Sequence, residues 1–148
     1  MPTSSPRHLL PIVAAFLPVP IIGAVLSAIW DVGASPDGGA GDMFLRGTAL
    51  TPPVFMPVLL VAGAAAARNE GRSGRIGAGL VSLVATGFLA GSTANLPNDF
   101  AAAEAAGTPR ALTAGTAGIH IIVSLALLYN ALPRLFERGA ARELSGTT

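Results

Sequence analysis

Four long stretches without any charged side chain, nearly equal in length and evenly spaced, dominate this chain. They cover residues 9–30, 47–67, 76–98 and 111–133, and none contains Asp, Glu, Lys or Arg. A helix needs about 20 mainly apolar residues to cross a hydrocarbon core of roughly 30 Å. The spacing therefore predicts an all-α protein, an antiparallel bundle of four transmembrane helices that forms one domain over residues 1–148. The predicted helices cover residues 9–30, 48–67, 76–96 and 112–132.

The overall composition agrees with a membrane protein and narrows its chemistry. Hydrophobic residues make up 51% of the chain and charged residues 11%, whereas soluble domains carry about 25% charged residues. A net charge of only +1 gives no basic surface for a nucleic-acid partner. The chain has no Cys, which excludes disulfides, thiol nucleophiles and Cys-ligated redox centres. No metal-ligand spacing and no phosphate-binding Gly-rich loop is present, so we predict neither a metal site nor a cofactor.

The arginines predict how the bundle lies in the membrane. With four crossings, the two ends of the chain share one side with the loop between the second and third helices. That side carries seven of the nine basic residues, and basic residues favour the cytoplasmic side. We therefore predict a multi-pass protein of the cell membrane with both termini in the cytoplasm. The seven are Arg7, Arg68, Arg72, Arg75, Arg134, Arg138 and Arg142; the other two are Arg46 and Arg110.

Small residues four positions apart recur on the predicted helices. In lipid, small residues let two helix backbones approach closely, and this packing drives helix association. We predict tight contacts at these rows, either inside the bundle or between copies in a homo-oligomer. The rows are Gly63–Ala67, Gly87–Gly91–Asn95 and Ala114–Gly118.

His120 is the only Asp, Glu, Lys, Arg or His within the four predicted membrane segments. It shares one face of the fourth helix with Thr113, Thr116 and Ser124, since these positions differ by three or four residues. An ionisable residue inside the membrane indicates function by default. The other interpretation is a neutral histidine that donates a hydrogen bond between helices.

A second polar cluster, Asn95-Leu-Pro-Asn-Asp99, lies where the third helix leaves the membrane. Pro97 ends a helix, and the simplest interpretation of the cluster is a helix-terminating turn. The third helix ends on the side where the fourth begins, so the cluster approaches the same non-cytoplasmic end as His120. Trp30 ends the first helix there, although a Trp at that level also suits an interfacial belt.

This convergence of polar groups in an otherwise apolar bundle predicts a small-molecule site. The hydroxyl groups of Thr48 and Thr51, at the start of the predicted second helix, are expected at the same end. The predicted catalytic residues are Asn95, Asp99 and His120, and the predicted substrate-binding residues are Trp30, Thr51, Asn98 and Thr116. The expected ligand is a hydrophobic small molecule, and the other expected contact is membrane lipid.

Two motifs carry a resemblance to a known family. The pattern Asn95-x-Pro97-x-Asp99 resembles the Asn-x-Pro-x-Asn signature of the anthrone oxygenase-like family of small four-helix membrane proteins. The stretch Pro53-Val-Phe-Met-Pro57 is similar to that family's second segment. This chain departs from the pattern in having Asp99 in place of the second Asn, and it lacks the Trp- and Arg-containing pattern around the fourth helix.

The resemblance implies an oxidoreductase that needs no cofactor. Such an enzyme oxidises a polycyclic phenolic substrate with molecular oxygen, for example an anthrone of polyketide type to an anthraquinone. His120 would then act as the base that forms the enolate, and Asn95 would donate a hydrogen bond to the enolate oxygen.

Two other function classes stay open at this point. Small-residue faces and scarce polar groups also suit a non-catalytic accessory subunit that packs against a larger membrane complex. A small channel or transporter is less well supported, because coupled carriers usually need a carboxylate inside the membrane and the four segments contain none.

Overall fold

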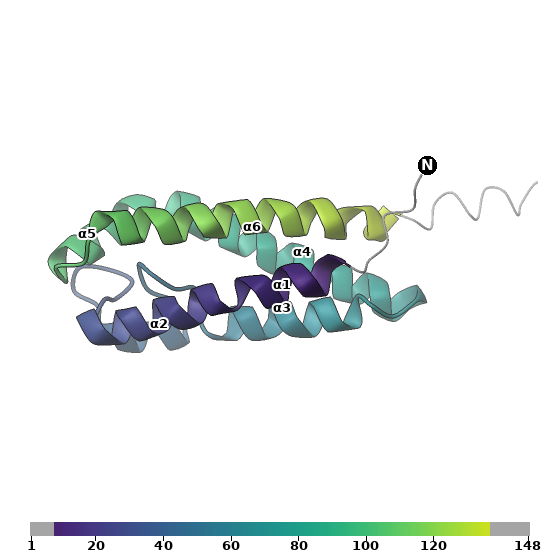
Figure 1. Ribbon diagram of the computed structural model, residues 1–148, viewed down its shortest axis with the longest axis horizontal. Helices are drawn as coiled ribbons and strands as arrows, with labels where there is room; N and C mark the ends of the chain where they lie inside the picture. Colours follow the sequence, from purple (N-terminus) through teal and green to yellow (C-terminus); the bar gives the residue numbers. More distant parts are fainter. Residues whose placement is uncertain (1–7, 137–148) are drawn as a thin grey trace, which may run out of the picture.

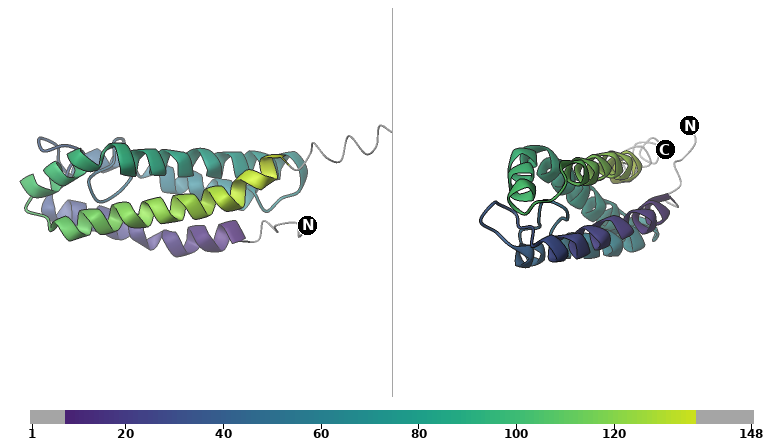
Figure 2. Two further views of the ribbon diagram at one scale, coloured as in Figure 1. Left: turned by 90° about the horizontal axis from the view of Figure 1, so that it is seen from above. Right: turned by 60° about the vertical axis from the view of Figure 1, so that its left-hand side comes forward.

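The computed structural model describes residues 8–136, and this part of the chain is helical with no β-strand. The long helices run along one axis of an elongated body, and α5 lies at one end of it (Figures 1 and 2). The predicted all-α class is therefore confirmed. The elements are α1 (Leu9–Phe16), α2 (Pro18–Trp30), the 3₁₀ helix η2 (Ala40–Phe44), α3 (Phe55–Ala66), α4 (Gly71–Ala94), α5 (Leu96–Ala105) and α6 (Arg110–Phe136).

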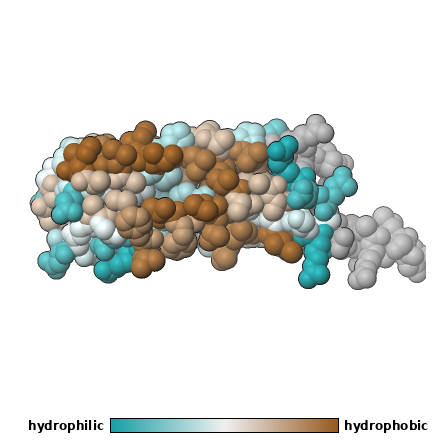
Figure 3. All heavy atoms as spheres, turned by 90° about the horizontal axis from the view of Figure 1, so that it is seen from below, coloured by the Kyte–Doolittle hydropathy of each residue, from teal (hydrophilic) through white to brown (hydrophobic). Residues whose placement is uncertain are grey.

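Three segments are long and apolar enough to cross a membrane. They are Leu9–Trp30, which joins α1 and α2, then Gly71–Ala94 and Arg110–Phe136. The fourth apolar helix, α3, has only 12 residues, which gives it a length of about 18 Å. On the face that Figure 3 shows, apolar side chains predominate along the middle of the body and the most hydrophilic ones lie towards its ends. This distribution is what a membrane-spanning protein requires.

Proline explains the break in the first segment, which the sequence predicted as one helix over residues 9–30. The helix is interrupted at Leu17, between α1 and α2. Pro18 and Pro20 have no backbone N–H, so the carbonyl groups four residues before each of them lose their helical partners. The segment continues in nearly the same direction (Figure 1), and Leu17 still donates its N–H to Val13 and accepts the N–H of Ile21.

The predicted second helix over residues 48–67 is wrong at its start, because α3 begins only at Phe55. A residue that precedes proline avoids the helical conformation, and both Thr51 and Pro52 precede one. Residues 47–54 instead form an irregular turn, in which the Thr48 and Thr51 backbones pair. Pro57 takes the place in the first helical turn where a missing N–H does no harm.

Side-chain hydroxyls fix this turn against the first segment. Thr48 Oγ1 accepts hydrogen bonds from the N–H groups of Leu50 and Thr51, each at 3.2 Å. The same oxygen lies 2.6 Å from Ser27 Oγ, and Thr51 Oγ1 donates to the Pro20 carbonyl at 3.1 Å. The turn is therefore tied into the body of the protein rather than left as a surface loop.

The third and fourth segments also differ from their predicted limits. α4 starts earlier than residue 76, at Gly71, and α6 extends beyond residue 132 to Phe136. After Asn95 the chain does not stay in a turn: Pro97 lies in the first turn of α5, where proline is favoured. At the opposite end of the body, Arg134 donates a hydrogen bond to the Ala67 carbonyl, just beyond the end of α3.

Glycine allows α3 and α4 to touch through their backbones. A Cβ atom added at Gly77 would lie 2.6 Å from the carbonyl oxygen of Gly63 and would also meet the backbone N of Ala67. One of the predicted small-residue rows, Gly63–Ala67, therefore packs inside the protein. The Gly87–Gly91 row instead lines a cavity, and Gly118 has open space around it.

We predict that Gly77→Ala destabilises the protein although alanine is the better helix former. The methyl group has no room between two backbones, and overpacking costs about 1–3 kcal/mol. The matched control is Gly118→Ala, where a Cβ meets nothing within 4 Å. Thermal unfolding in detergent should show a lower midpoint for Gly77→Ala and an unchanged or higher one for Gly118→Ala. Equal midpoints for the two variants would contradict the close approach of α3 and α4.

Candidate functional site

A cavity of about 450 Å³ lies at the end of the body that holds α5. Its walls come from α4, α5, α6, the first turn of α3 and the loop residues 34–35 and 46–53. Ligand sites in proteins usually have volumes of about 300–1,000 Å³, so the cavity is large enough for a small organic molecule. Six of the seven residues that the sequence singled out line it: Thr51, Asn95, Asn98, Asp99, Thr116 and His120.

His120 contributes a buried ring nitrogen to this region. Its side chain is 5% exposed, and Nδ1 lies 2.6 Å from the Thr116 carbonyl oxygen. A carbonyl can only accept, so Nδ1 carries the proton and the neutral ring has its lone pair on Nε2. Nε2 is buried and has no hydrogen-bond partner within residues 8–136. The lone pair of this nitrogen therefore has no partner in the described part of the chain.

Two aromatic rings hold the imidazole in place. Phe16 of α1 meets it edge to face, with ring centroids 5.3 Å apart and an interplanar angle of 88°. Phe88 of α4 lies at 5.7 Å and 76°. Such arrangements are favourable for aromatic pairs. The ring therefore cannot turn without displacing side chains from two other helices, and its orientation is set before any ligand arrives.

The amide and carboxyl groups of the second predicted cluster lie at the junction of α4 and α5. Asn95 is both the C-cap residue of α4 and the N-cap residue of α5. Its backbone carbonyl accepts the N–H of Asp99 at 2.9 Å. The side chains of Asn95 and Asn98 are exposed, whereas Asp99 is half-buried. Burial raises the pKa of the Asp99 carboxyl to about 6, because the charged form loses hydration.

We predict that Asp99 makes the stability of the protein depend on pH. Its pKa of about 6 in the folded protein exceeds the value of about 3.9 in an unfolded chain. Between these two pKa values the folded state binds more protons than the unfolded state. The free energy of unfolding therefore falls as the pH rises from about 4 to 6. Asp99→Asn should remove that fall from thermal unfolding midpoints. Asp37→Asn, which removes an exposed carboxylate outside the cavity lining, is the control, and the same pH profile for wild type and Asp99→Asn would refute the assignment.

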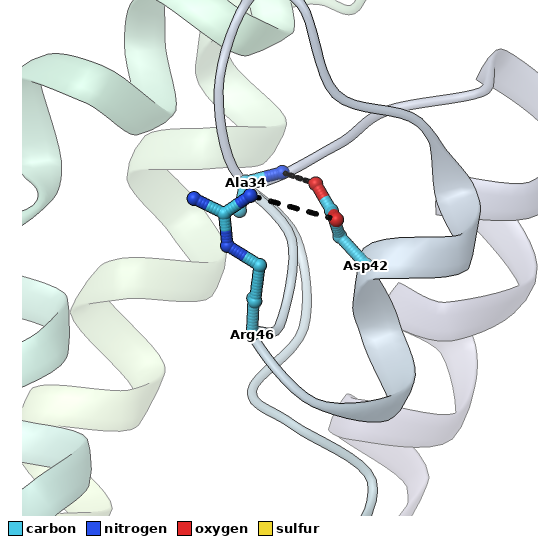
Figure 4. A network of polar contacts seen from close by, with 3 residues as sticks. All are labelled: Ala34, Asp42 and Arg46. Carbon is cyan, nitrogen blue, oxygen red and sulfur yellow. Dashed lines mark hydrogen bonds and ion pairs between the residues drawn. The ribbon is translucent and has the colours of Figure 1, made fainter.

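Arg46 is a cavity residue that the sequence did not single out as part of the site. It belongs to a Gly-rich loop that Asp42 stabilises, since Asp42 Oδ2 accepts the Ala34 N–H at 3.0 Å (Figure 4). The other oxygen of Asp42 lies 4.0 Å from Arg46 Nη1. Asp31 likewise accepts the Ala40 N–H at 2.8 Å. Its position could have indicated a role in the site, because Arg46 is the only basic residue close to Thr48 and Thr51 in the sequence.

Trp30 is the one candidate that the structure does not bring to the cavity. It ends α2 and packs against a small apolar cluster that includes Val32, Leu50 and Ala103. This cluster supports the turn beneath the cavity. The predicted contact between Trp30 and a substrate therefore has no counterpart in the cavity lining.

Comparison with known proteins gives no further indication of fold or function. No protein-family model, no curated protein and no solved structure matches this chain.

In the part of the chain that the structure describes, no group of three His, Asp or Glu side chains is placed to hold a metal ion. The groups available for chemistry in the cavity are an imidazole, two amides, a carboxyl, a guanidinium and several hydroxyls.

Proposed function

We propose that the chain is an integral membrane protein that crosses the membrane four times with both termini in the cytoplasm. The apolar lengths of three segments support three crossings. For the fourth, α3 and the turn at residues 47–54 would act together. Non-helical backbone is tolerated at membrane depth only where protein covers it or where it lines a cavity. The turn meets this condition, because residues 49–51 are buried and residues 47–53 line the cavity.

The arginines support the proposed orientation. Arg134 reaches the carbonyl of Ala67, which places the end of α6 beside the loop with Arg68 and near the start of α4, which carries Arg72 and Arg75. Arg46, in contrast, lines the cavity at the other end. The excess of basic residues at the first end favours the cytoplasm there. The remaining predicted cytoplasmic arginines, Arg7, Arg138 and Arg142, lie outside the described residues, as do both termini.

We further propose that the cavity is the active site of a cofactor-independent oxygenase that acts on anthrone-like polycyclic phenols. The observation behind this proposal is the buried, unpartnered Nε2 of His120, a residue that lines a cavity together with amide donors. A base and hydrogen-bond donors are what enolate formation from a carbon acid requires. The resemblance of Asn95-x-Pro97-x-Asp99 to the anthrone oxygenase-like signature suggests the substrate class.

The proposed reaction needs only the substrate and oxygen. Nε2 of His120 removes one proton from the CH₂ group of the anthrone, and Asn95 donates a hydrogen bond to the enolate oxygen. The enolate passes electrons to O₂, a carbon–oxygen bond forms, and the proton returns to give a hydroperoxide. Loss of the second C–H proton and of hydroxide then breaks the O–O bond. One CH₂ and one O₂ thus become one C=O and one H₂O.

Oxygen uptake tests this function. The protein purified in mild detergent should consume one O₂ per anthrone converted, and ¹⁸O₂ should label the new carbonyl group of the anthraquinone. The Asn95→Ala variant should be slower, because removing one oxyanion donor costs about 100- to 1,000-fold in rate. Turnover no faster than in buffer, with folded protein present, would eliminate the proposal.

A non-catalytic accessory subunit is the second candidate, and one surface favours it. Ala114, Gly115 and Gly118 form an accessible row on α6, and a Cβ at either glycine meets nothing within 4 Å. Such a row can admit a helix from another membrane protein or from a second copy. Native mass spectrometry of the detergent-solubilised protein would show a stoichiometric partner in this case and none if the protein acts alone.

A further inference from the structure

The wall of the cavity carries one cation whose hydrogen-bonding capacity is largely unused. Arg46 lines the cavity, its side chain is 68% exposed, and its nearest carboxylate, Asp42, lies at 4.0 Å. A distance of 4.0 Å is too long for a hydrogen bond. Asp42 is instead hydrogen-bonded to the backbone of Ala34. Within residues 8–136, the guanidinium of Arg46 makes no hydrogen bond, so its five N–H donors face solvent or the cavity.

Arg110, the other arginine predicted on this side of the membrane, is arranged differently. Its Nη2 donates to Glu104 at 2.6 Å, and it does not line the cavity. A closely paired arginine carries little net charge towards its surroundings. Of the two arginines predicted on this side of the membrane, the loosely paired one, Arg46, lines the cavity and the closely paired one, Arg110, does not.

The remaining walls of the cavity carry both apolar and polar side chains. Leu50, Met56 and Phe88 are the large apolar side chains of the lining, and Phe88 also packs against His120. Arg46 itself is exposed and lies immediately before the turn at residues 47–54. A molecule with a flat apolar body and one anionic group would therefore bind with the rings near His120 and the anion at Arg46.

We propose that Arg46 binds an acidic substituent of the substrate, so that the preferred substrate is an aromatic acid rather than a neutral aromatic. This inference rests on the proposed function only where it concerns the reacting CH₂ group. The binding of an acidic substituent by Arg46 is a separate claim. A guanidinium donates two parallel hydrogen bonds to a carboxylate, and such charge-assisted pairs are about twice as strong as neutral ones. Arg46 is thus a specificity-determining residue that orients the CH₂ group towards the base.

The experiment compares an anthrone carboxylic acid with its methyl ester. The quantity measured is the ratio of the two kcat/KM values, which should favour the acid in wild-type protein. Arg46→Gln should lower that ratio by about 10- to 100-fold, Arg46→Lys should restore part of it, and Arg110→Gln should keep the wild-type ratio. An unchanged ratio in Arg46→Gln, or an equal change in Arg110→Gln, would overturn the assignment.

A second measurement separates this inference from the proposed function. An anthraquinone carboxylate has no CH₂ group and cannot react, so its dissociation constant reports binding alone. Binding that weakens about 10- to 100-fold in Arg46→Gln supports the acid site even if no oxidation occurs. Binding of the carboxylate and its ester with equal affinity in wild-type protein would overturn the acid site even if anthrone oxidation is observed.

Discussion

Replacing His120 with glutamine is expected to lower the rate of anthrone oxidation by about 100- to 10,000-fold, the usual contribution of a positioned general base. Glutamine is of similar size and keeps a hydrogen-bonding group, but its amide cannot accept a proton from carbon. The loss should appear in kcat, because the apolar walls that bind the rings remain. Oxygen uptake at saturating substrate measures it directly.

Ser124→Ala is the matched control for this substitution. Ser124 lies one turn further along the same face of α6, is fully buried and also lacks a hydrogen-bond partner in the described part of the chain. It does not line the cavity. Its loss should leave the rate close to that of the wild type. A His120→Gln protein that keeps half of the wild-type activity would show that His120 is a packing residue.

Filling the cavity through Gly91 is expected to have the second largest effect. Gly91 lines the cavity, and a Cβ added there meets nothing within 4 Å, so a leucine side chain can start there without a clash with the protein. Its side chain would take space that the ligand needs. Overpacking a filled site costs about 1–3 kcal/mol, which corresponds to a loss of about 5- to 150-fold in affinity for an anthraquinone ligand.

Gly115→Leu provides the comparison, because Gly115 has equally open space but is exposed on α6 and does not line the cavity. Both variants replace a helical glycine with a better helix former, so neither should unfold earlier than the wild type. Titration of ligand fluorescence should show weak binding only for Gly91→Leu. Wild-type affinity in Gly91→Leu would mean that the ligand binds elsewhere.

Much of this architecture could be predicted because the composition of a membrane-spanning segment is enough to recognise it. The absence of charge over some 20 residues identifies an apolar helix without knowledge of its neighbours. Counting crossings then assigns helix ends to sides of the membrane, which is why the sequence alone predicts Asn95, Asp99 and His120 at one end. The cavity does bring these three side chains together, although their proposed roles stay predictions.

The parts that could not be predicted depend on contacts between residues far apart in sequence. The late start of α3 follows locally from Pro52 and Pro53, but the turn before it is held by a hydrogen bond from Thr51 to Pro20, 31 residues away. The aromatic contacts that orient His120 come from α1 and α4. Arg46 belongs to the site only because the loop folds back over the cavity. No periodicity in the sequence reports such contacts.

The central claim is that His120 removes a proton from a carbon acid bound in the cavity, and hydrogen exchange tests it most directly. Anthrone is incubated with the protein in D₂O without oxygen, so that no oxidation can follow, and deuterium in its CH₂ group is measured by mass spectrometry. The wild type should accelerate the exchange by about 100-fold or more over buffer, and His120→Gln should return it to the buffer rate. Equal exchange by the wild type and His120→Gln would contradict the account.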